Sequence, residues 1–357
     1  MVGISLLTLV PGVVGGSETY VRELLRGLAA AGTLDYRVLT SAGLELAQPN
    51  GAGGRFEVTP VPSYRFSATM RGRSLAMARA AFRPDPIRRD MRLGELDAIH
   101  FPLSVMLPRV GTPPAAATVH DLQHEVFPSF FSRPELAYRR RAYAWTARLS
   151  RLVITPSAFV AGTIAEGLGV PEGRVRVIHH GLDHDRFFPD ARERQLFLLY
   201  PANRWPHKNH ERLFQALALV RRSRPELRLV LTGAGHDGSL LPAGVETRGR
   251  VSDEELVDLY RSASALVFPS LYEGFGTPPL EAMACGCPVA SSTAGALPEV
   301  VGDAAALFDP GSAEAIADGI ERALTDDSLP ERGLAHAARF TWAASARAHE
   351  GVYRELA

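Results

Sequence analysis

The chain has 357 residues, which predicts two domains at about 150 residues each. Apolar residues make up 46% of it and charged residues 22%, as in a globular protein with substantial cores. Its 39 basic and 39 acidic side chains balance, which argues against a nucleic-acid partner bound through overall charge. Two cysteines, Cys285 and Cys287, are too few for a disulfide framework or a four-ligand zinc site and fit the cytoplasm.

The amino-terminal apolar run, residues 2–14, follows no basic residue and precedes no cleavage site of small residues. We therefore expect a buried first strand here and not a signal peptide. No stretch reaches the roughly 18 to 20 apolar residues that a spanning helix needs, so we expect a soluble protein.

Short apolar runs alternate with helical patterns along the whole chain, which is typical of parallel strands buried on both faces. In the first half the predicted strands are 2–9, 36–40, 56–61, 98–101, 115–120, 152–155 and 175–179, and the predicted helices are 17–31, 68–90, 134–150 and 158–167. In the second half the predicted strands are 197–200, 227–232, 245–248, 265–268, 289–291 and 305–308, and the predicted helices are 211–222, 253–262, 278–285 and 312–324.

This pattern predicts an α/β protein with two doubly wound, Rossmann-like domains facing each other across a cleft. We expect residues 1–190 to form the first domain and residues 191–340 the second. A last helix within residues 341–357 is expected to pack back onto the first domain. Ligands of such sheets bind beyond the carboxyl ends of the strands, so residues that follow strands are the candidates for a site.

A glycine-spaced loop, residues 272–277, joins one predicted strand to a helix that begins with two prolines. Free N–H groups at Gly276 and Thr277, together with the helix dipole, suit phosphate oxygens. Glu273 precedes the helix and Glu281 lies within it. Two carboxylates flanking an anion site suit a ligand with hydroxyls at both ends and phosphate in the middle, although Glu281 alone could serve the helix dipole.

Lys208 is the only lysine of the chain and lies in a second strand-to-helix loop, four residues after Arg204. A compact ammonium fits a crowded diphosphate better than a planar guanidinium. Together the two cations could neutralise a leaving phosphate. Two weaker candidates lie in the first half: the paired glycines Gly15 and Gly16 before the first helix, and His120-Asp121 after a buried strand.

The Glu273-Gly274-Phe275-Gly276 string continuing to Glu281 resembles the Glu-x7-Glu signature of retaining nucleotide-sugar glycosyltransferases of family 4, which have the two-Rossmann GT-B fold. Similar to the same family, in the same order, are Gly15-Gly16, residues 155–157 and 177–183, the Arg204/Lys208 pair and residues 340–342. The string 205–210 is most similar to members that transfer mannose or related hexoses. Many members space the two cations five residues apart, not four.

The resemblance implies a role for each candidate. Glu281 would bind the ribose hydroxyls, Glu273 the hydroxyls of the donor sugar, and the backbone of Gly274, Phe275, Gly276 and Thr277 the sugar and phosphate. Arg204 and Lys208 would hold the diphosphate, approached by Gly15 and Gly16 from the first domain. His120 would lie at the reacting face of the sugar with Asp121 orienting it, and the base would lie against Arg250 and Val251.

Three other segments contain patterns that resemble binding sites but also have structural interpretations. The glycine pattern from Gly233 to Gly238 is interpreted as a turn, because Pro242 leaves no room for the helix that a dinucleotide site needs. Asp183-His184-Asp185 is interpreted as a structural turn, not a metal site. The segment from Arg65 to Arg92 holds eight arginines and two acids. It predicts either a solvated helical excursion or an acceptor-side patch that contacts a lipid-linked diphosphate or the anionic lipid at the inner face of a membrane.

We therefore expect a retaining hexosyltransferase that needs no metal. The donor would be GDP-mannose or another nucleoside-diphosphate hexose, and the acceptor a hydroxyl of a glycan, a lipid-linked saccharide or a small molecule. Two alternatives are a non-catalytic nucleotide-sugar-binding protein and a nicotinamide-dependent oxidoreductase that uses the loop at Gly233.

Overall fold

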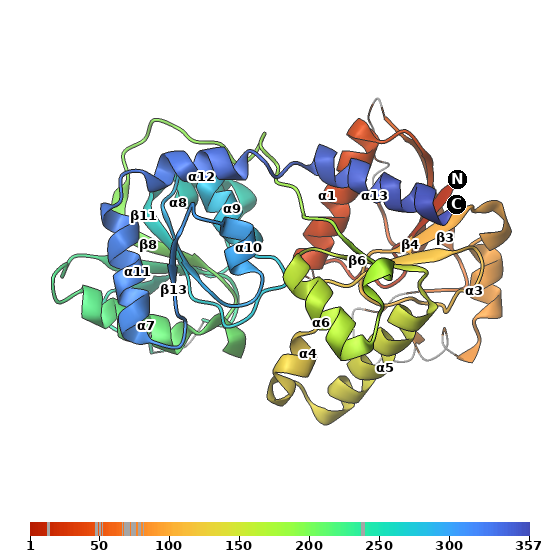
Figure 1. Cartoon of the computed structure of the whole chain (residues 1–357), viewed down its shortest axis with the longest axis horizontal. Coiled ribbons are helices and arrows are strands. Elements are labelled where there is room, and N and C mark those ends of the chain that lie inside the picture. The colour runs from red at the N-terminus through yellow and green to blue at the C-terminus, as the bar shows by residue number, and fades with distance from the viewer. Residues whose placement is uncertain are drawn as a thin grey trace. The chain divides into compact units, whose positions relative to one another are not determined.

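The computed structural model describes residues 1–12, 15–46, 49, 51, 53–65, 67, 72, 76, 77, 80, 82–236 and 240–357. The chain divides into two compact units (Figure 1). Unit 1 comprises residues 1–181 together with 342–357, and unit 2 comprises residues 182–341. Among the described residues, no helix combines the length and the apolar composition that crossing a bilayer requires.

Unit 1 is built on a parallel sheet in which β1 and β4 occupy central positions. In spatial order the strands are β3 (Arg55–Val61), β2 (Asp35–Ser41), β1 (Val2–Ser5), β4 (Ala98–Phe101), β5 (Ala115–Thr118), β6 (Leu152–Thr155) and β7 (Val175–Val177). The helices described for this unit are α1 (Gly16–Ala31), α3 (Asp85–Asp90), α4 (Gln123–Val126), α5 (Arg133–Leu149), α6 (Ala158–Leu168) and α13 (Trp342–Leu356), with short 3-10 turns at Leu93–Glu95, Pro128–Phe130 and Glu172–Arg174.

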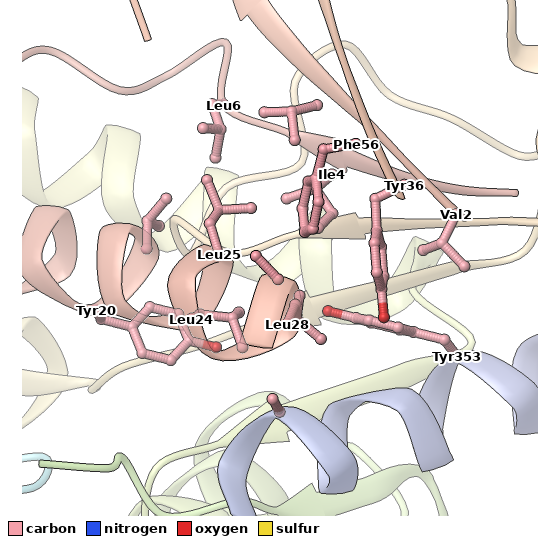
Figure 2. Packing of buried hydrophobic residues seen from close by; sticks show 14 of the residues in the cluster. Val2, Ile4, Leu6, Tyr20, Leu24, Leu25, Leu28, Tyr36, Phe56 and Tyr353 are labelled. Atoms are coloured by element: carbon pink, nitrogen blue, oxygen red, sulfur yellow. The ribbon is translucent and has the colours of Figure 1, made fainter. Parts of the chain in front are cut away.

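Helix α13 packs on α1 although the two lie at opposite ends of the chain (Figure 1). A Cβ on Gly27 of α1 would lie only 2.8 Å from the carbonyl oxygen of Trp342, so the absence of a side chain permits this close approach. Buried Glu350 of α13 accepts hydrogen bonds from the Leu34 amide (2.9 Å) and from the hydroxyl of Tyr36. Figure 2 shows the apolar cluster between these elements, to which Tyr20, Leu24 and Leu28 of α1 and Tyr353 of α13 belong. The last helix is therefore an integral part of unit 1.

Unit 2 is also built on a parallel sheet, with β8 at the point where the strand order reverses. In spatial order its strands are β10 (Val245–Thr247), β9 (Arg228–Thr232), β8 (Gln195–Pro201), β11 (Ala263–Phe268), β12 (Val289–Ser292) and β13 (Ala306–Phe308). Its helices are the 3-10 turn η4 (Pro206–Lys208), α7 (His210–Val220), α8 (Asp253–Ser262), α9 (Thr277–Ala284), α10 (Leu297–Val301), α11 (Ala313–Thr325) and α12 (Leu329–Ala337).

Several predicted boundaries differ from the structure for local reasons. Unit 2 begins at Leu182, before the predicted boundary at residues 190 and 191, because Arg186 donates a 2.8 Å hydrogen bond to Asp253 and the Phe187 ring packs on Tyr260. Strand β1 ends at Ser5, earlier than predicted, because the connection that follows it is itself buried and apolar.

The predicted helix 68–90 is described only in part. The structure describes α3 near its end, whereas Arg71, Arg73 and Arg79 lie outside the described residues. Arg88 of α3 donates a 2.9 Å hydrogen bond to the Arg109 carbonyl and pairs with Asp85. The question of a lipid-binding patch in this segment therefore stays a prediction.

Candidate functional site

The loops that carry Lys208 and Glu273 leave the sheet of unit 2 from adjacent strands. Lys208 follows β8 and Glu273 follows β11, and these strands pair in parallel. The chain continues from β8 to β9 on one side, whereas β12 and β13 extend the sheet on the other side of β11. In doubly wound sheets, ligands bind beyond the carboxyl ends of the strands at the point where the chain diverges in this way.

At this edge the ammonium of Lys208 lies 2.6 Å from Oε1 of Glu273. Both side chains are largely buried, with exposed fractions of 14% and 16%. The Lys208 nitrogen also lies 5.3 Å from the centre of the Phe268 ring, at the end of β11. The structure thus brings together a cation and a carboxylate that were predicted to serve one ligand.

Backbone contacts hold Lys208 at this position. The hydroxyl of Tyr200 donates to the Lys208 carbonyl over 2.7 Å, and the Leu271 amide donates to the His207 carbonyl over 2.8 Å. Asn209, in the left-handed conformation at φ 59°, donates through Nδ2 to the carbonyls of Pro269 (3.1 Å) and Pro310 (2.9 Å). The loop after β8 is therefore hydrogen-bonded to the loop after β11. These bonds fix the backbone of Lys208, and so they restrict where its flexible side chain can place the ammonium.

The Glu273 backbone is held with equal tightness. Gly295, at φ 64°, lies so close that a Cβ there would be 2.8 Å from the Glu273 nitrogen, and the Ala296 amide donates to the Glu273 carbonyl over 3.0 Å. The following residues, Gly274 to Thr277, lead into α9, as predicted. Gly276 precedes α9 at φ 105°, and a Cβ on it would lie 2.5 Å from a methyl group of Leu297. Only glycine suits that position.

The amino end of α9 has no side-chain cap. The two prolines Pro278 and Pro279 have no N–H groups, so the backbone donors at this end come from the residues around Gly276 and Thr277. Phe275 is buried, with its ring centre 6.1 Å from that of Phe340. An uncapped helix start beside a lysine is a favourable place for an anionic group.

Glu281, on the same helix, accepts a 2.7 Å hydrogen bond from the hydroxyl of Tyr260 on α8. Burial raises the pKa of Glu281 to about 7, and the bond from Tyr260 opposes part of that rise. Its other oxygen is not engaged by Tyr260. Tyr260 is a further residue of the candidate site that the sequence did not reveal, because no motif marks it and its contact depends on how α8 packs against α9.

Arg204 is directed differently from Lys208. Its guanidinium donates to exposed Glu211 over 2.9 Å, and its backbone amide donates to the Ala234 carbonyl over 2.9 Å. The Ala234 amide in turn donates to Oδ1 of Asn203 over 2.7 Å. The glycine-rich turn after β9 thus supports the loop that carries Arg204. In this structure the two predicted diphosphate-binding cations pair with different carboxylates.

Arg250 and Val251 lie in the connection between β10 and α8, where Arg250 is exposed. The carbonyl of the preceding Gly249 accepts a 2.7 Å hydrogen bond from the Gly233 amide, so this connection adjoins the end of β9. Ser252 then caps α8 by accepting from the Glu255 amide over 3.1 Å.

In unit 1 the paired glycines lie at the start of α1, as predicted. Gly15 precedes the helix at φ 56° and Gly16 is its first residue, and a Cβ on either would meet no atom within 4 Å. Glu18 in the first turn accepts a 2.7 Å hydrogen bond from the Gly12 amide. Val13 and Val14 lie outside the described residues.

His120 follows β5 and is oriented by a backbone carbonyl. Its Nε2 donates to the Pro102 carbonyl over 2.8 Å, and burial lowers its pKa. Oδ1 of Asp121 accepts from the Gln123 amide over 3.0 Å, at the start of α4. The hydrogen bond that fixes the His120 ring therefore runs to Pro102, whereas the sequence suggested Asp121 for that task.

Comparison with known proteins assigns both units. Residues 14–186 match the family described as Glycosyltransferase Family 4, and residues 183–339 match the family described as Glycosyl transferases group 1. The chain is 34% identical over 254 residues to the O-antigen chain mannosyltransferase B of Escherichia coli, covering 64% of this chain and 67% of that protein. It is 30% identical over 397 residues to the MMP alpha-(1->4)-mannosyltransferase of Mycolicibacterium hassiacum, covering 96% and 95%.

Among solved structures, sucrose-phosphate synthase from Thermosynechococcus elongatus matches with a TM-score of 0.73 and 20% identity, covering 99% of this chain and 98% of that one. This likeness confirms the predicted GT-B type of fold with two Rossmann-like α/β units. The sequence relatives show the family as well as the fold, because one of them is 30% identical to this chain over nearly its full length. The chain belongs to the family 4 glycosyltransferases.

Proposed function

We propose that this chain transfers a mannosyl residue from GDP-mannose to a hydroxyl of a glycan or lipid-linked saccharide, with retention at the anomeric carbon. The donor would bind to unit 2, and unit 1 would serve the acceptor side. Two relatives named as mannosyltransferases support the choice of sugar. The observation that carries the proposal is the Lys208–Glu273 pair at the carboxyl edge of β8 and β11.

Negative charge grows on the leaving diphosphate during sugar transfer, and groups already aimed at that charge lower the barrier most. The Lys208 ammonium and the uncapped start of α9 are such groups. Glu273, released from Lys208 when phosphate arrives, would accept hydrogen bonds from hydroxyls of the donor sugar. Glu281, whose pKa of about 7 allows the carboxylate form, would accept from the ribose hydroxyls.

The other predicted residues take supporting roles in this proposal. Arg204 would turn from Glu211 towards the diphosphate, and the backbone near Arg250 and Val251 would face the base. Gly15, Gly16, His120 and Asp121 keep the roles that the family resemblance gives them. The reaction needs no metal in this scheme, because the charge of the leaving group is met by side chains and backbone.

A thermal-shift screen against nucleoside-diphosphate sugars tests the donor. A donor at a hundredfold excess over its dissociation constant stabilises the folded state by about 2.7 kcal/mol. We expect GDP-mannose to raise the melting temperature more than UDP- or dTDP-hexoses. Product analysis by NMR then tests the stereochemistry: a product with the donor's α configuration supports retention, and the β configuration contradicts it.

A peripheral contact with the inner face of the cytoplasmic membrane, through residues between Arg65 and Arg92, belongs to the same proposal. Each basic residue near an anionic surface contributes about 1 kcal/mol. Flotation with anionic and neutral vesicles tests the contact. If the protein does not float with anionic vesicles, the membrane contact is contradicted, and the proposal is then a cytoplasmic enzyme without it.

A further inference from the structure

A chain of polar side chains runs through the buried interior of unit 1, between α13 and the strands β4 and β5. Every member is at most 2% exposed. Its links join Tyr353 Oη to His100 Nδ1 (2.9 Å), His100 Nε2 to Thr118 Oγ1 (2.8 Å), Thr118 Oγ1 to Tyr20 Oη (3.1 Å), Tyr20 Oη to His349 Nε2 (2.8 Å) and His349 Nδ1 to the Ser345 carbonyl (2.8 Å).

The last link fixes the direction of all the others. A carbonyl only accepts, so His349 must carry a proton on Nδ1, and a neutral ring then leaves Nε2 as an acceptor. Tyr20 therefore gives its single hydroxyl proton to His349. Because that proton is used, Thr118 must donate to Tyr20, and His100 must donate to Thr118 through Nε2. Nδ1 of His100 is then an acceptor for the hydroxyl of Tyr353.

Neutral rings are the form that this interior favours. Burial lowers the pKa of His100 well below its ordinary value and lowers that of His349 to about 4. With both rings neutral, five groups give five protons to five acceptors. No other arrangement of the hydroxyl protons keeps all five bonds.

The series of hydrogen bonds is connected to His120 by the ring of Tyr20, which contacts the His120 ring. The ring centres of Tyr20 and His120 lie 4.8 Å apart in an edge-to-face arrangement of 79°. Figure 2 shows Tyr20 on α1 and Tyr353 on α13 at the same apolar cluster. The hydroxyl of Tyr20 is held from two sides, by Thr118 and His349. The His120 ring therefore packs against a side chain whose hydroxyl is fixed, while its Nε2 is held by Pro102.

We propose that Tyr20 is a positioning residue for His120 and that the carboxyl-terminal helix fixes it through this directed chain, with His349 protonated on Nδ1 and His100 on Nε2. The role for His120 in transfer rests on the proposed function. The two tautomers do not, since they follow from the hydrogen bonds of unit 1 alone.

Nitrogen-15 NMR of the histidine-labelled full chain tests the direction. In a neutral ring the nitrogen without a proton resonates far from the protonated one, so long-range correlations to the ring protons identify each tautomer. His100→Gln and His349→Gln spectra assign the signals. We expect opposite neutral tautomers for the two rings at pH 7. The same tautomer in both rings, or a cationic His349, would contradict the proposed direction of the hydrogen bonds.

Enzyme kinetics test the positioning. Tyr20→Phe keeps the ring and removes the hydroxyl, and we expect kcat to fall about tenfold with the donor KM within twofold, as for a small displacement of a reacting group. Tyr353→Phe is the matched control, because it removes a buried phenol hydroxyl from the far end of the chain and leaves both bonds to Tyr20 intact. Its kcat should stay within twofold of wild type.

A folded Tyr20→Phe protein with wild-type kcat would overturn the positioning role. An equal loss in both variants would do the same, since it would indicate a general effect on unit 1. Absence of transfer by the wild-type protein from every nucleotide sugar would instead contradict the proposed function. The NMR result decides the direction of the chain in either case.

Discussion

The Lys208 ammonium and the Glu273 carboxylate, 65 positions apart in the chain, lie 2.6 Å from each other at the carboxyl edge of the unit 2 sheet. Each is the ion-pair partner of the other. A partly buried ion pair of this kind keeps both side chains in place. In the proposed function, a donor with a diphosphate and sugar hydroxyls would replace each partner, with phosphate at Lys208 and hydroxyls at Glu273, and would leave no charge unpaired.

Replacing Lys208 should lower turnover strongly. In Lys208→Ala we expect kcat to fall by a factor on the order of 10² to 10³, because the charge that develops on the leaving group loses its main cation. Sugar transfer from the donor identified by the screen measures this. Arg332→Ala, which removes an exposed cation of the same unit paired with Asp326, is the control and should leave kcat unchanged. Near-normal turnover by Lys208→Ala would contradict the role of the pair.

Nucleotide binding should strengthen as Glu281 ionises. Burial raises the pKa of Glu281 from its ordinary value of 4.5 to about 7. The carboxylate that would accept from the ribose hydroxyls therefore forms between pH 6 and 8, and affinity for GDP should rise about tenfold over this range. Calorimetric titration at several pH values measures it. In Glu281→Gln the rise should vanish, whereas Glu246→Gln, at an exposed ion pair with Arg228, should retain it.

The raised pKa of Glu281 also predicts how the free energy of unfolding changes with pH. The folded state holds the Glu281 proton more tightly than the unfolded state, so its contribution to stability is present below pH 4.5 and is lost as the pH rises through about 7. Relative to wild type, Glu281→Gln should therefore gain stability across this window. Urea unfolding between pH 5 and 8 measures the difference, and a difference independent of pH would argue against the raised pKa.

Gly276 should tolerate no side chain. Gly276→Ala would place a Cβ 2.5 Å from a methyl group of Leu297 on a backbone at φ 105°, which we expect to lower the free energy of unfolding by about 1–3 kcal/mol. Gly162→Ala is the control, because its Cβ would meet nothing within 4 Å in the middle of α6, and it should stabilise by about 0.5–1 kcal/mol. Equal stability of the two variants in urea would show that the start of α9 adapts freely.

Mild acid should lower the free energy of unfolding of unit 1. Burial lowers the pKa of His349 from 6.5 to about 4, so the unfolded chain takes up a proton in this interval and the folded chain does not. The stability supplied by the neutral ring is present above pH 6.5 and falls by about 3 kcal/mol as the pH drops to about 4. Urea unfolding in Trp145→Phe/Trp205→Phe protein, where Trp342 on the same helix is the remaining tryptophan, measures the loss by fluorescence. His349→Gln should show a shallower fall over this interval.

The sequence was informative about strands and strand-end loops. The apolar runs predicted β2, β4 and β6 to within a residue or so, because strands buried on both faces carry continuous apolar stretches. The glycine-spaced loop before α9 was also predicted correctly, since the glycines and prolines there follow from local backbone requirements. The helices α10 and α12 were not predicted; α10 spans only five residues, too few for a clear period.

Contacts between distant loops could not be predicted in the same way. The sequence grouped Lys208 with Arg204 because they are neighbours in the chain, whereas the structure pairs Lys208 with Glu273 and Arg204 with Glu211. Which loops meet depends on strand order, and here that order brings β8 beside β11. The bond from Tyr260 to Glu281 likewise requires α8 to pack beside α9.

Titration of GDP into the wild-type protein and into Lys208→Ala tests most directly whether the Lys208–Glu273 pair is a diphosphate site. A charge-assisted hydrogen bond contributes about 1.5–3 kcal/mol, so wild type should bind GDP and the variant should bind it about 10 to 100 times more weakly. Equal affinities, or a wild-type protein that binds no nucleoside diphosphate, would contradict the account.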